Sequence, residues 1–317
     1  MSIEFNKLLS GDWIIAEALN ILVRELDEKS KSSSLSSYIN KALHIRNALP
    51  QAISIDNFID THRDDDEIAV CGKLAIVRSI LDAEKNSVLY LDPLNTESNF
   101  NYASLEEIWY KPFFQIITEN CEKKGLSERL NSIVLIVFNY DRCVEHYLYY
   151  ALQNYYGISK EESADLVRSL KIYHPYGKVG SLPWSGIGDS IGFGVEPQPK
   201  QLLELSSQIK TFTEGIDPEF SEITPIKTYM ANADRLVFLG FAFHKKNMLL
   251  ITPDSSTVKY VPKCYATTYG IYDSDQEVIR FQIGNLYIST VPDSYNVSMA
   301  HLKCNSFFYE FWRSLAF

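Results

Sequence analysis

The chain has 317 residues, of which 46% are hydrophobic and 22% are charged, and its formal net charge is −10. This length suits one large α/β domain or two small ones, and the acidic balance argues against nucleic acid or an anionic membrane as a bulk electrostatic partner. The five cysteines have no zinc-ligand spacing. We therefore expect reduced thiols and no bound metal. The sequence also shows neither a signal peptide nor an apolar run long enough to span a membrane, so we expect a soluble cytoplasmic protein.

The first portion, residues 1–125, is predicted to be mostly helical. Apolar residues recur at helical spacing or follow capping residues in four segments: 11–26, 54–60, 68–84 and 104–121. Ser104 and Glu107 form a capping box for the last of these, and Pro112 predicts a kink within it. The Ser-rich stretch 29–37 predicts a loop. We expect this portion to form a cap or subdomain on the remainder.

The second portion, residues 126–317, alternates between strand and helix patterns. Strands are predicted at 132–138, 172–173, 235–240 and 263–269, and helices at 142–155, 161–170, 203–212, 225–233 and 299–315. Residues 183–199 are rich in Gly, Pro and Ser and predict a long loop. Alternation of this kind indicates a Rossmann-like parallel sheet flanked by helices, within a single domain of residues 1–317. The apolar terminal helix is expected to pack on its own domain rather than to serve as an oligomer contact.

The segment 132–141 is the most informative part of the chain. Its first seven residues are uncharged and largely β-branched, which predicts a fully buried strand. The strand stops at Asn139, Tyr140 and Asp141. Open α/β sheets bind ligands at the carboxyl ends of their strands, so an amide and a carboxylate here are candidates for a ligand site. Asn and Asp also favour Asx-type turns and helix N-caps, and from these residues alone that second interpretation stands equally well.

Two further predicted strand ends supply side chains for the same crevice. Their candidate residues are His174, Tyr176 and Gly177 after strand 172–173, and Gly240, Phe241, His244 and Asn247 after strand 235–240. Adjacent strand ends of one polarity form one crevice, so we expect the three groups to meet. The structural alternatives are an ordinary half-buried histidine, glycines that only supply turn geometry, and polar residues that cap the next helix.

Six segments, taken in chain order, resemble the sirtuin-like NAD-hydrolysing domains of bacterial antiphage defence systems. They are Ser54-Ile55-Asp56-x-Phe58, Gly72 to Ile76 with Glu84, Ile108-Trp109-Tyr110, Asn139-Tyr140-Asp141, His174-x-Tyr176-Gly177-x-x-Gly180-x-Leu182-Pro183-Trp184, and Phe238-Leu239-Gly240-Phe241-x-Phe243-His244-x-x-Asn247. Each segment is a weak signal alone, whereas the set spans roughly residues 50–250 in one order.

The resemblance implies hydrolysis of the nicotinamide–ribose bond of NAD, which depletes host NAD after phage infection. In that scheme Asn139 orients the ribose or the attacking water, His174 accepts a proton, and Asp141 holds the local geometry and stabilises positive charge on the ribose. The implied NAD-contacting residues are Phe138, Tyr140, Asp56, Tyr176, Gly177, Gly240, Phe241, His244 and Asn247. The resemblance further implies a homo-oligomer, with a HerA-like ATPase or another defence protein as a partner.

Two departures from the family pattern keep a second interpretation open. The family opens with a strand and a Gly-Ala-Gly-x-Ser loop that cradles the pyrophosphate, whereas residues 1–11 contain only Ser10-Gly11. Either the chain starts downstream of this motif or the phosphate site has diverged. Tyr176 stands where the family histidine often precedes glycine, so Tyr176 and His174 are both candidates for the key base. The alternative function is a catalytically weak nucleotide-binding or assembly subunit of a defence complex. Lysine deacylation is not expected, because the sequence has no C-x-x-C zinc pair.

Overall fold

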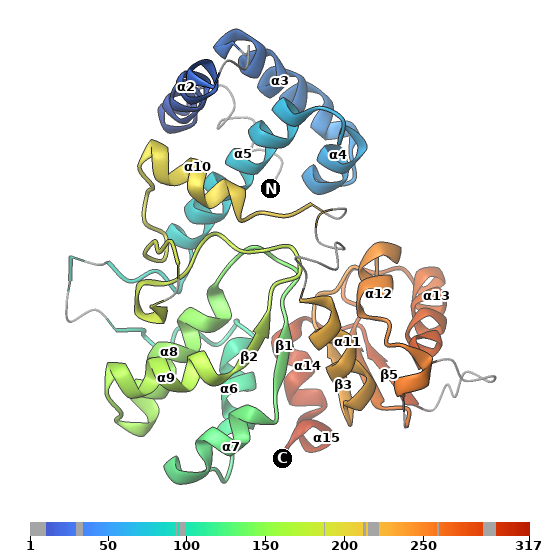
Figure 1. Ribbon diagram of the computed structural model, residues 1–317. Coiled ribbons are helices and arrows are strands. Elements are labelled where there is room, and N and C mark those ends of the chain that lie inside the picture. The colour runs from blue at the N-terminus through green and yellow to red at the C-terminus, as the bar shows by residue number, and fades with distance from the viewer. Residues whose placement is uncertain are drawn as a thin grey trace.

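The computed structural model describes residues 11–29, 34–92, 94–95, 99–186, 188–211, 214, 222–258, 260–287 and 296–317. Helices dominate this mixed α/β fold, and its strands form two small parallel sheets (Figure 1). One sheet contains β1 (Val134–Ile136) and β2 (Lys171–Tyr173), and the other has the order β3 (Arg235–Phe238), β4 (Lys263–Thr267), β5 (Val297–Ala300). The prediction of parallel strands flanked by helices is confirmed at this level.

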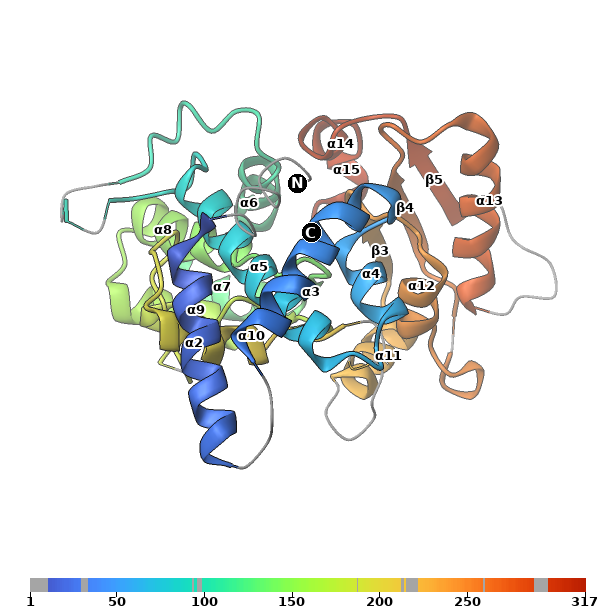
Figure 2. The same ribbon diagram turned by 90° about the horizontal axis from the view of Figure 1, so that it is seen from above.

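The N-terminal helices form a layer that lies above the two sheets in Figure 1 and in front of them in Figure 2. The layer contains α2 (Trp13–Glu28), α3 (Leu35–Ala48), α4 (Ile55–Thr61) and α5 (Asp66–Lys85). Each begins at a side-chain cap, supplied in turn by Asp12, Ser34, Ser54 and Asp65. Helix α3 was not expected, because its Ser-rich start reads as a loop in the sequence. Helix α10 (Pro199–Ser207) returns to this layer and packs against α2 and α5.

The helices around the first sheet are α6 (Tyr110–Thr118), α7 (Leu126–Asn131), α8 (Cys143–Tyr156) and α9 (Lys160–Ser169). The predicted start of α6 at a capping box is wrong: the Ser104 hydroxyl donates to the Asn101 carbonyl, and the helix begins at Tyr110. Pro112 therefore falls in the first turn, where its missing N–H is not needed by the helix, so the reason for expecting a kink no longer applies. Short 3-10 turns occupy Leu49–Gln51, Lys123–Gly125, Pro183–Ser185, Ser255–Thr257 and Asn285–Tyr287.

The strands differ in how deeply they are buried. The prediction of a fully buried first strand is wrong, because Val134, Leu135 and Ile136 are only half-buried. Among the described residues β1 pairs with β2 alone, so its other edge gains no cover from a neighbouring strand. Strand β4 has partners on both sides, and its residues from Cys264 to Thr267 are all buried. Burial in this fold therefore follows the number of paired strand edges.

The C-terminal part places α11 (Ile223–Asn232), α12 (Lys245–Ile251) and α13 (Asp273–Gly284) around the second sheet (Figure 1). The predicted terminal helix over 299–315 is divided. Its beginning is strand β5, which pairs with β4, and α14 (Cys304–Glu310) and α15 (Trp312–Leu315) follow. Pairing with β4 overrides the local helical pattern. Phe307 and Phe308 of α14 are buried against α6, which confirms that the terminal helix packs on its own domain.

The described residues bury their apolar side chains in two clusters. One lies beneath the N-terminal helices and continues into α12 and α13, and the other joins α6–α9 to α14 and α15. Within the described part of the chain, no helix combines the length and hydropathy that crossing a bilayer requires.

Candidate functional site

Aromatic rings bring the three predicted strand ends together. Phe138 follows β1, Tyr176 follows β2 and Phe241 follows β3. The Phe138 ring centroid lies 5.0 Å from that of Phe241 and 5.8 Å from that of Tyr176. Such edge-to-face contacts are stabilising and define one aromatic cluster at the strand ends. The sequence-based expectation that these segments meet is thus reproduced in the geometry.

Two hydrogen bonds between predicted ligand-binding residues close part of this region. The Tyr176 hydroxyl donates to Asn247 Oδ1 at 2.7 Å, and both residues are buried. The Tyr140 hydroxyl donates to an Asp56 carboxylate oxygen and lies 3.2 Å from the Lys210 carbonyl. Burial raises the pKa of Asp56, an effect that the hydrogen bond from Tyr140 opposes. These bonds tie α4 and α12 to the strand ends.

His174 lies between acceptors on both sides of its ring. Its Nε2 is 3.0 Å from Glu145 Oε1, and its Nδ1 is 3.4 Å from the backbone carbonyl oxygen of Asn139. Its backbone N–H donates to Glu222 Oε2 at 3.1 Å. His174 and Asn139, which come from two neighbouring strand ends, are therefore in direct contact. The contact is through the Asn139 backbone, whereas the Asn139 residue itself is exposed.

Glu145 was not among the predicted site residues. It lies in the first turn of α8, is 5% exposed, and receives hydrogen bonds at Oε1 from His174 and from Lys178 Nζ at 3.1 Å. Burial alone raises the pKa of this carboxyl, but the hydrogen bond and charge of His174 and the charge of Lys178 outweigh burial and hold the pKa below its ordinary value. Its second oxygen, Oε2, is buried without a hydrogen-bond partner among the described residues.

Asp141 makes the contact of an Asx-type turn just before α8. Its Oδ1 accepts a hydrogen bond of 3.1 Å from the backbone N–H of Cys143, the first residue of α8. The side chain thus satisfies one of the unpaired donors at the helix start. Both the ligand-site and the turn interpretation place Asp141 at the carboxyl end of β1, and the hydrogen bond to the Cys143 N–H is the contact that the turn interpretation predicts.

The backbone after β2 and β3 takes conformations that favour glycine. Gly177 has φ +77°, and a Cβ there would lie 1.9 Å from the Gln208 carbonyl oxygen. Gly240 has φ +58°, and its N–H donates to Thr267 Oγ1 at 2.8 Å. Phe243 is buried and also left-handed, with φ 52°, a conformation that costs a non-glycine residue about 1–2 kcal/mol. His244 follows as an exposed N-cap residue whose side chain makes no capping bond.

A second buried ion pair lies beside this region and was also not predicted. Arg142, which precedes α8, is fully buried and donates from Nε and Nη2 to the two oxygens of Glu84, at 3.0 and 2.5 Å. Its remaining bonds go to the carbonyl oxygens of Ser181, Ile191 and Gly192. Every guanidinium nitrogen is satisfied, so the pair joins α5, α8 and the loop at 181–194.

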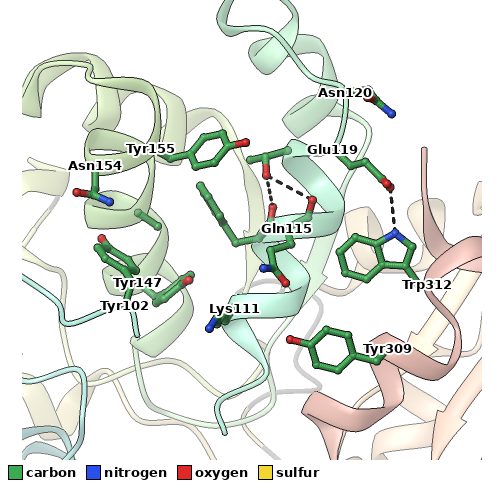
Figure 3. Close-up of a pocket in the computed structure, with 13 residues that line it drawn as sticks. Tyr102, Lys111, Gln115, Glu119, Asn120, Tyr147, Asn154, Tyr155, Tyr309 and Trp312 are labelled. Atoms are coloured by element: carbon green, nitrogen blue, oxygen red, sulfur yellow. Dashed lines mark hydrogen bonds between the residues drawn. The ribbon is translucent and has the colours of Figure 1, made fainter. Parts of the chain in front are cut away.

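A cavity of about 680 Å³ lies away from these strand ends, between α6, α8 and α14–α15 (Figure 3). Tyr147 and Tyr155 reach it from α8, and Tyr309 and Trp312 from the C-terminal helices. The Trp312 indole N–H donates to Glu119 at 3.2 Å across one side. None of the sequence-predicted site residues lines this cavity.

Among the described residues, no group of three or more His, Cys, Asp or Glu side chains is arranged to hold a metal ion. Compared with known proteins, the chain matches no protein-family model, no curated protein and no solved structure.

Proposed function

We propose that this chain is an NAD glycohydrolase that cleaves the nicotinamide–ribose bond and acts in antiphage defence by depleting NAD. The observation that carries the proposal is the contact between His174 Nδ1 and the Asn139 backbone carbonyl, which brings together two residues that lie 35 apart in the sequence and follow two neighbouring parallel strands. An amide and a titratable ring at the carboxyl ends of parallel strands are suited to ligand chemistry. The ring contact between Phe138 and Phe241 supports a further proposal, that the two sheets are halves of one Rossmann-like sheet.

The proposed reaction consumes one water. The N-glycosidic bond breaks and its electron pair leaves with nicotinamide, while the ribose carbon gains positive charge and forms a new bond to the water oxygen. The Asn139 amide orients the water or the ribose, and His174 takes up the released proton. Asp141 contributes negative potential near the ribose while its Oδ1 accepts from the Cys143 N–H at the start of α8. Nicotinamide and ADP-ribose are the products.

Other features bear on how NAD would be held. The aromatic cluster offers apolar cover, and the exposed Asn139 side chain offers an amide to solvent. Asp56, Tyr140, Tyr176 and Asn247 form hydrogen bonds with one another, so these groups shape the wall of the proposed site. We place the enzyme in the cytoplasm as a homo-oligomer, with a HerA-like ATPase or another defence protein as the proposed partner.

A second candidate function is an assembly or nucleotide-binding subunit with weak catalysis. The closed Tyr140–Asp56 and Tyr176–Asn247 pairs favour it, because polar groups that bond to each other are less available to a ligand.

The deciding experiment incubates the purified chain with NAD, alone and with the protein encoded next to it, and follows nicotinamide release by chromatography. We expect release by the wild type and none by Asn139→Ala. The matched control is Asn131→Ala, which removes an exposed asparagine just before the opposite end of β1. His174→Ala is a less clean test, because it removes a hydrogen bond to buried Glu145. Absence of release in both mixtures, with no thermal shift by NAD, would favour the assembly function.

A further inference from the structure

The contacts of His174 determine which of its nitrogens carries a proton. Nε2 faces Glu145 Oε1 at 3.0 Å, and the low pKa of Glu145 keeps that carboxylate ionised near neutral pH. A carboxylate oxygen accepts hydrogen bonds and cannot donate one. Nδ1 faces the weaker of the two acceptors, the uncharged Asn139 backbone carbonyl at the longer distance of 3.4 Å. In a neutral ring the single proton is therefore held on Nε2 by the carboxylate, and Nδ1 carries the lone pair.

Glu145 is itself restrained. The Lys178 ammonium lies 3.1 Å from the same carboxylate oxygen. Lys178 directly follows Gly177 in the chain, and the backbone at Gly177 packs so closely on Gln208 that a Cβ there would lie 1.9 Å from the Gln208 carbonyl oxygen. Helix α8 fixes the other end of Glu145, because the residue stands in the first turn between buried neighbours. A carboxylate held in this way orients the imidazole that it binds, as outer-shell carboxylates do for catalytic and metal-binding histidines.

We propose that Glu145 is the positioning residue of the site: it holds His174 in the Nε2–H form and directs Nδ1 toward Asn139, while Lys178 restrains Glu145. The effect on turnover rests on the proposed NAD hydrolysis. The effect on the ring does not, since it concerns only the side chains of this chain.

The ring is tested first, by long-range ¹H–¹⁵N correlation spectra of histidine-labelled protein at a pH where the imidazole is neutral. The chain has 6 histidines, and the His174 signal is assigned by its loss in His174→Gln. We expect the wild-type ring to be protonated at Nε2 and the Glu145→Gln ring to shift toward the Nδ1–H form, since the new amide can donate to Nε2. A wild-type ring protonated at Nδ1, or a ring unchanged in Glu145→Gln, would overturn the proposal.

Turnover is tested next with the same variants. We expect Glu145→Gln to lower kcat by roughly 10- to 100-fold, with KM changed less than about threefold, because Glu145 orients the base and does not hold NAD. Lys178→Met should lower kcat by a smaller factor. The matched control is Glu161→Gln, an exposed carboxylate in the first turn of α9, which should keep wild-type kcat.

The outcomes separate the two proposals. Wild-type release of nicotinamide with unaltered kcat in Glu145→Gln contradicts the positioning role and leaves the hydrolase function in place. Absence of release by the wild type contradicts the hydrolase function, and the ring spectra then decide the Glu145–His174 arrangement by themselves. Circular dichroism and thermal melts of each variant establish that a loss of turnover comes from a folded protein.

Discussion

Two buried carboxylates lie near the start of α8, Glu84 of α5 and Glu145 of α8 itself. They differ in how many of their oxygens accept hydrogen bonds. In the Glu84–Arg142 cluster both carboxylate oxygens accept from the guanidinium, and the backbone N–H of Gly194 adds a further bond at 2.9 Å. In the Glu145 cluster one oxygen accepts from both His174 and Lys178, and the other has no partner among the described residues.

This difference distinguishes a structural role for the Glu84–Arg142 cluster from the role that we propose for Glu145. A buried charge network with every donor paired makes the local structure rigid, and it leaves nothing for a ligand to bind. A buried oxygen without a hydrogen-bond partner lowers the stability of the fold. Such groups are found most often at sites that bind a ligand or transfer a proton. The comparison therefore favours a structural role for Arg142, and it agrees with the positioning role that we propose for Glu145.

The largest expected effect on stability comes from removing Arg142 from the Glu84–Arg142 cluster. Arg142→Met leaves the Glu84 carboxylate buried without its partner, which should lower the free energy of unfolding by about 3–5 kcal/mol. Urea denaturation measures the change. The control is Lys124→Met, which removes one member of an exposed pair with Glu122 and should change stability by less than about 1 kcal/mol. Equal losses in the two variants would show that the buried network does not stabilise the fold.

The next effect tests the turn that places Lys178 beside Glu145. Gly177→Ala adds a Cβ within 1.9 Å of a carbonyl oxygen and requires a left-handed alanine, so we expect a loss of about 2–4 kcal/mol. Gly157→Ala is the matched control: its φ is +62° and a Cβ there meets no atom within 4 Å. That variant should lose only the conformational cost of about 1–2 kcal/mol. Thermal and urea denaturation of the two variants should differ accordingly, and identical losses would exclude close contact at Gly177.

The smallest expected effect is on the pH dependence of stability, which should differ in direction between Glu145 and Asp56. The pKa of Glu145 is lowered in the folded state, so its contribution to stability is present above the unfolded value of about 4.3 and is lost as the pH falls toward the folded value. The advantage of the wild type over Glu145→Gln should therefore shrink on acidification below about pH 5.

Asp56 should behave in the opposite way. Burial raises its folded-state pKa, so the ionised form weakens the fold, and that penalty grows as the pH rises through the raised value. Asp56→Asn keeps an acceptor for the Tyr140 hydroxyl and should gain stability relative to the wild type, by about 1 kcal/mol or less, between pH 4 and pH 7. Denaturation midpoints at several pH values measure both trends, and parallel pH curves for the two variants would contradict the assigned directions.

The sequence predicts the coarse arrangement better than the local detail. The cores of β1, β3 and β4 fall within predicted strands, since short apolar runs between polar segments are too short for core helices. The meeting of Asn139 with His174 was also anticipated, because parallel strands bring their carboxyl ends to one edge. The capping box predicts a start for α6 that is too early. The Ser104 hydroxyl donates to the Asn101 carbonyl instead of capping a helix, and this competing local bond cannot be recognised from the capping pattern.

The charged clusters were missed because their partners are distant in sequence. Glu145 and His174 lie 29 residues apart, and Glu84 and Arg142 lie 58 apart. A signal for Glu145 does exist in the sequence: it is a carboxylate beside Val144 on a helix whose following turns, with Leu148 and Leu152, are apolar. A charge on the buried face of a predicted helix indicates a partner, but no periodicity identifies which residue that partner is.

The long spacing of the Arg142 contacts has a kinetic consequence. The guanidinium bonds to Glu84 across 58 residues and to Ile191 and Gly192 across 49 and 50. Closing chain segments of that length costs entropy before any of these bonds forms, and the guanidinium gives up its water only when all three segments are in place. We therefore expect Arg142 to be buried late during folding, so that substitutions there accelerate unfolding and leave the refolding rate almost unchanged.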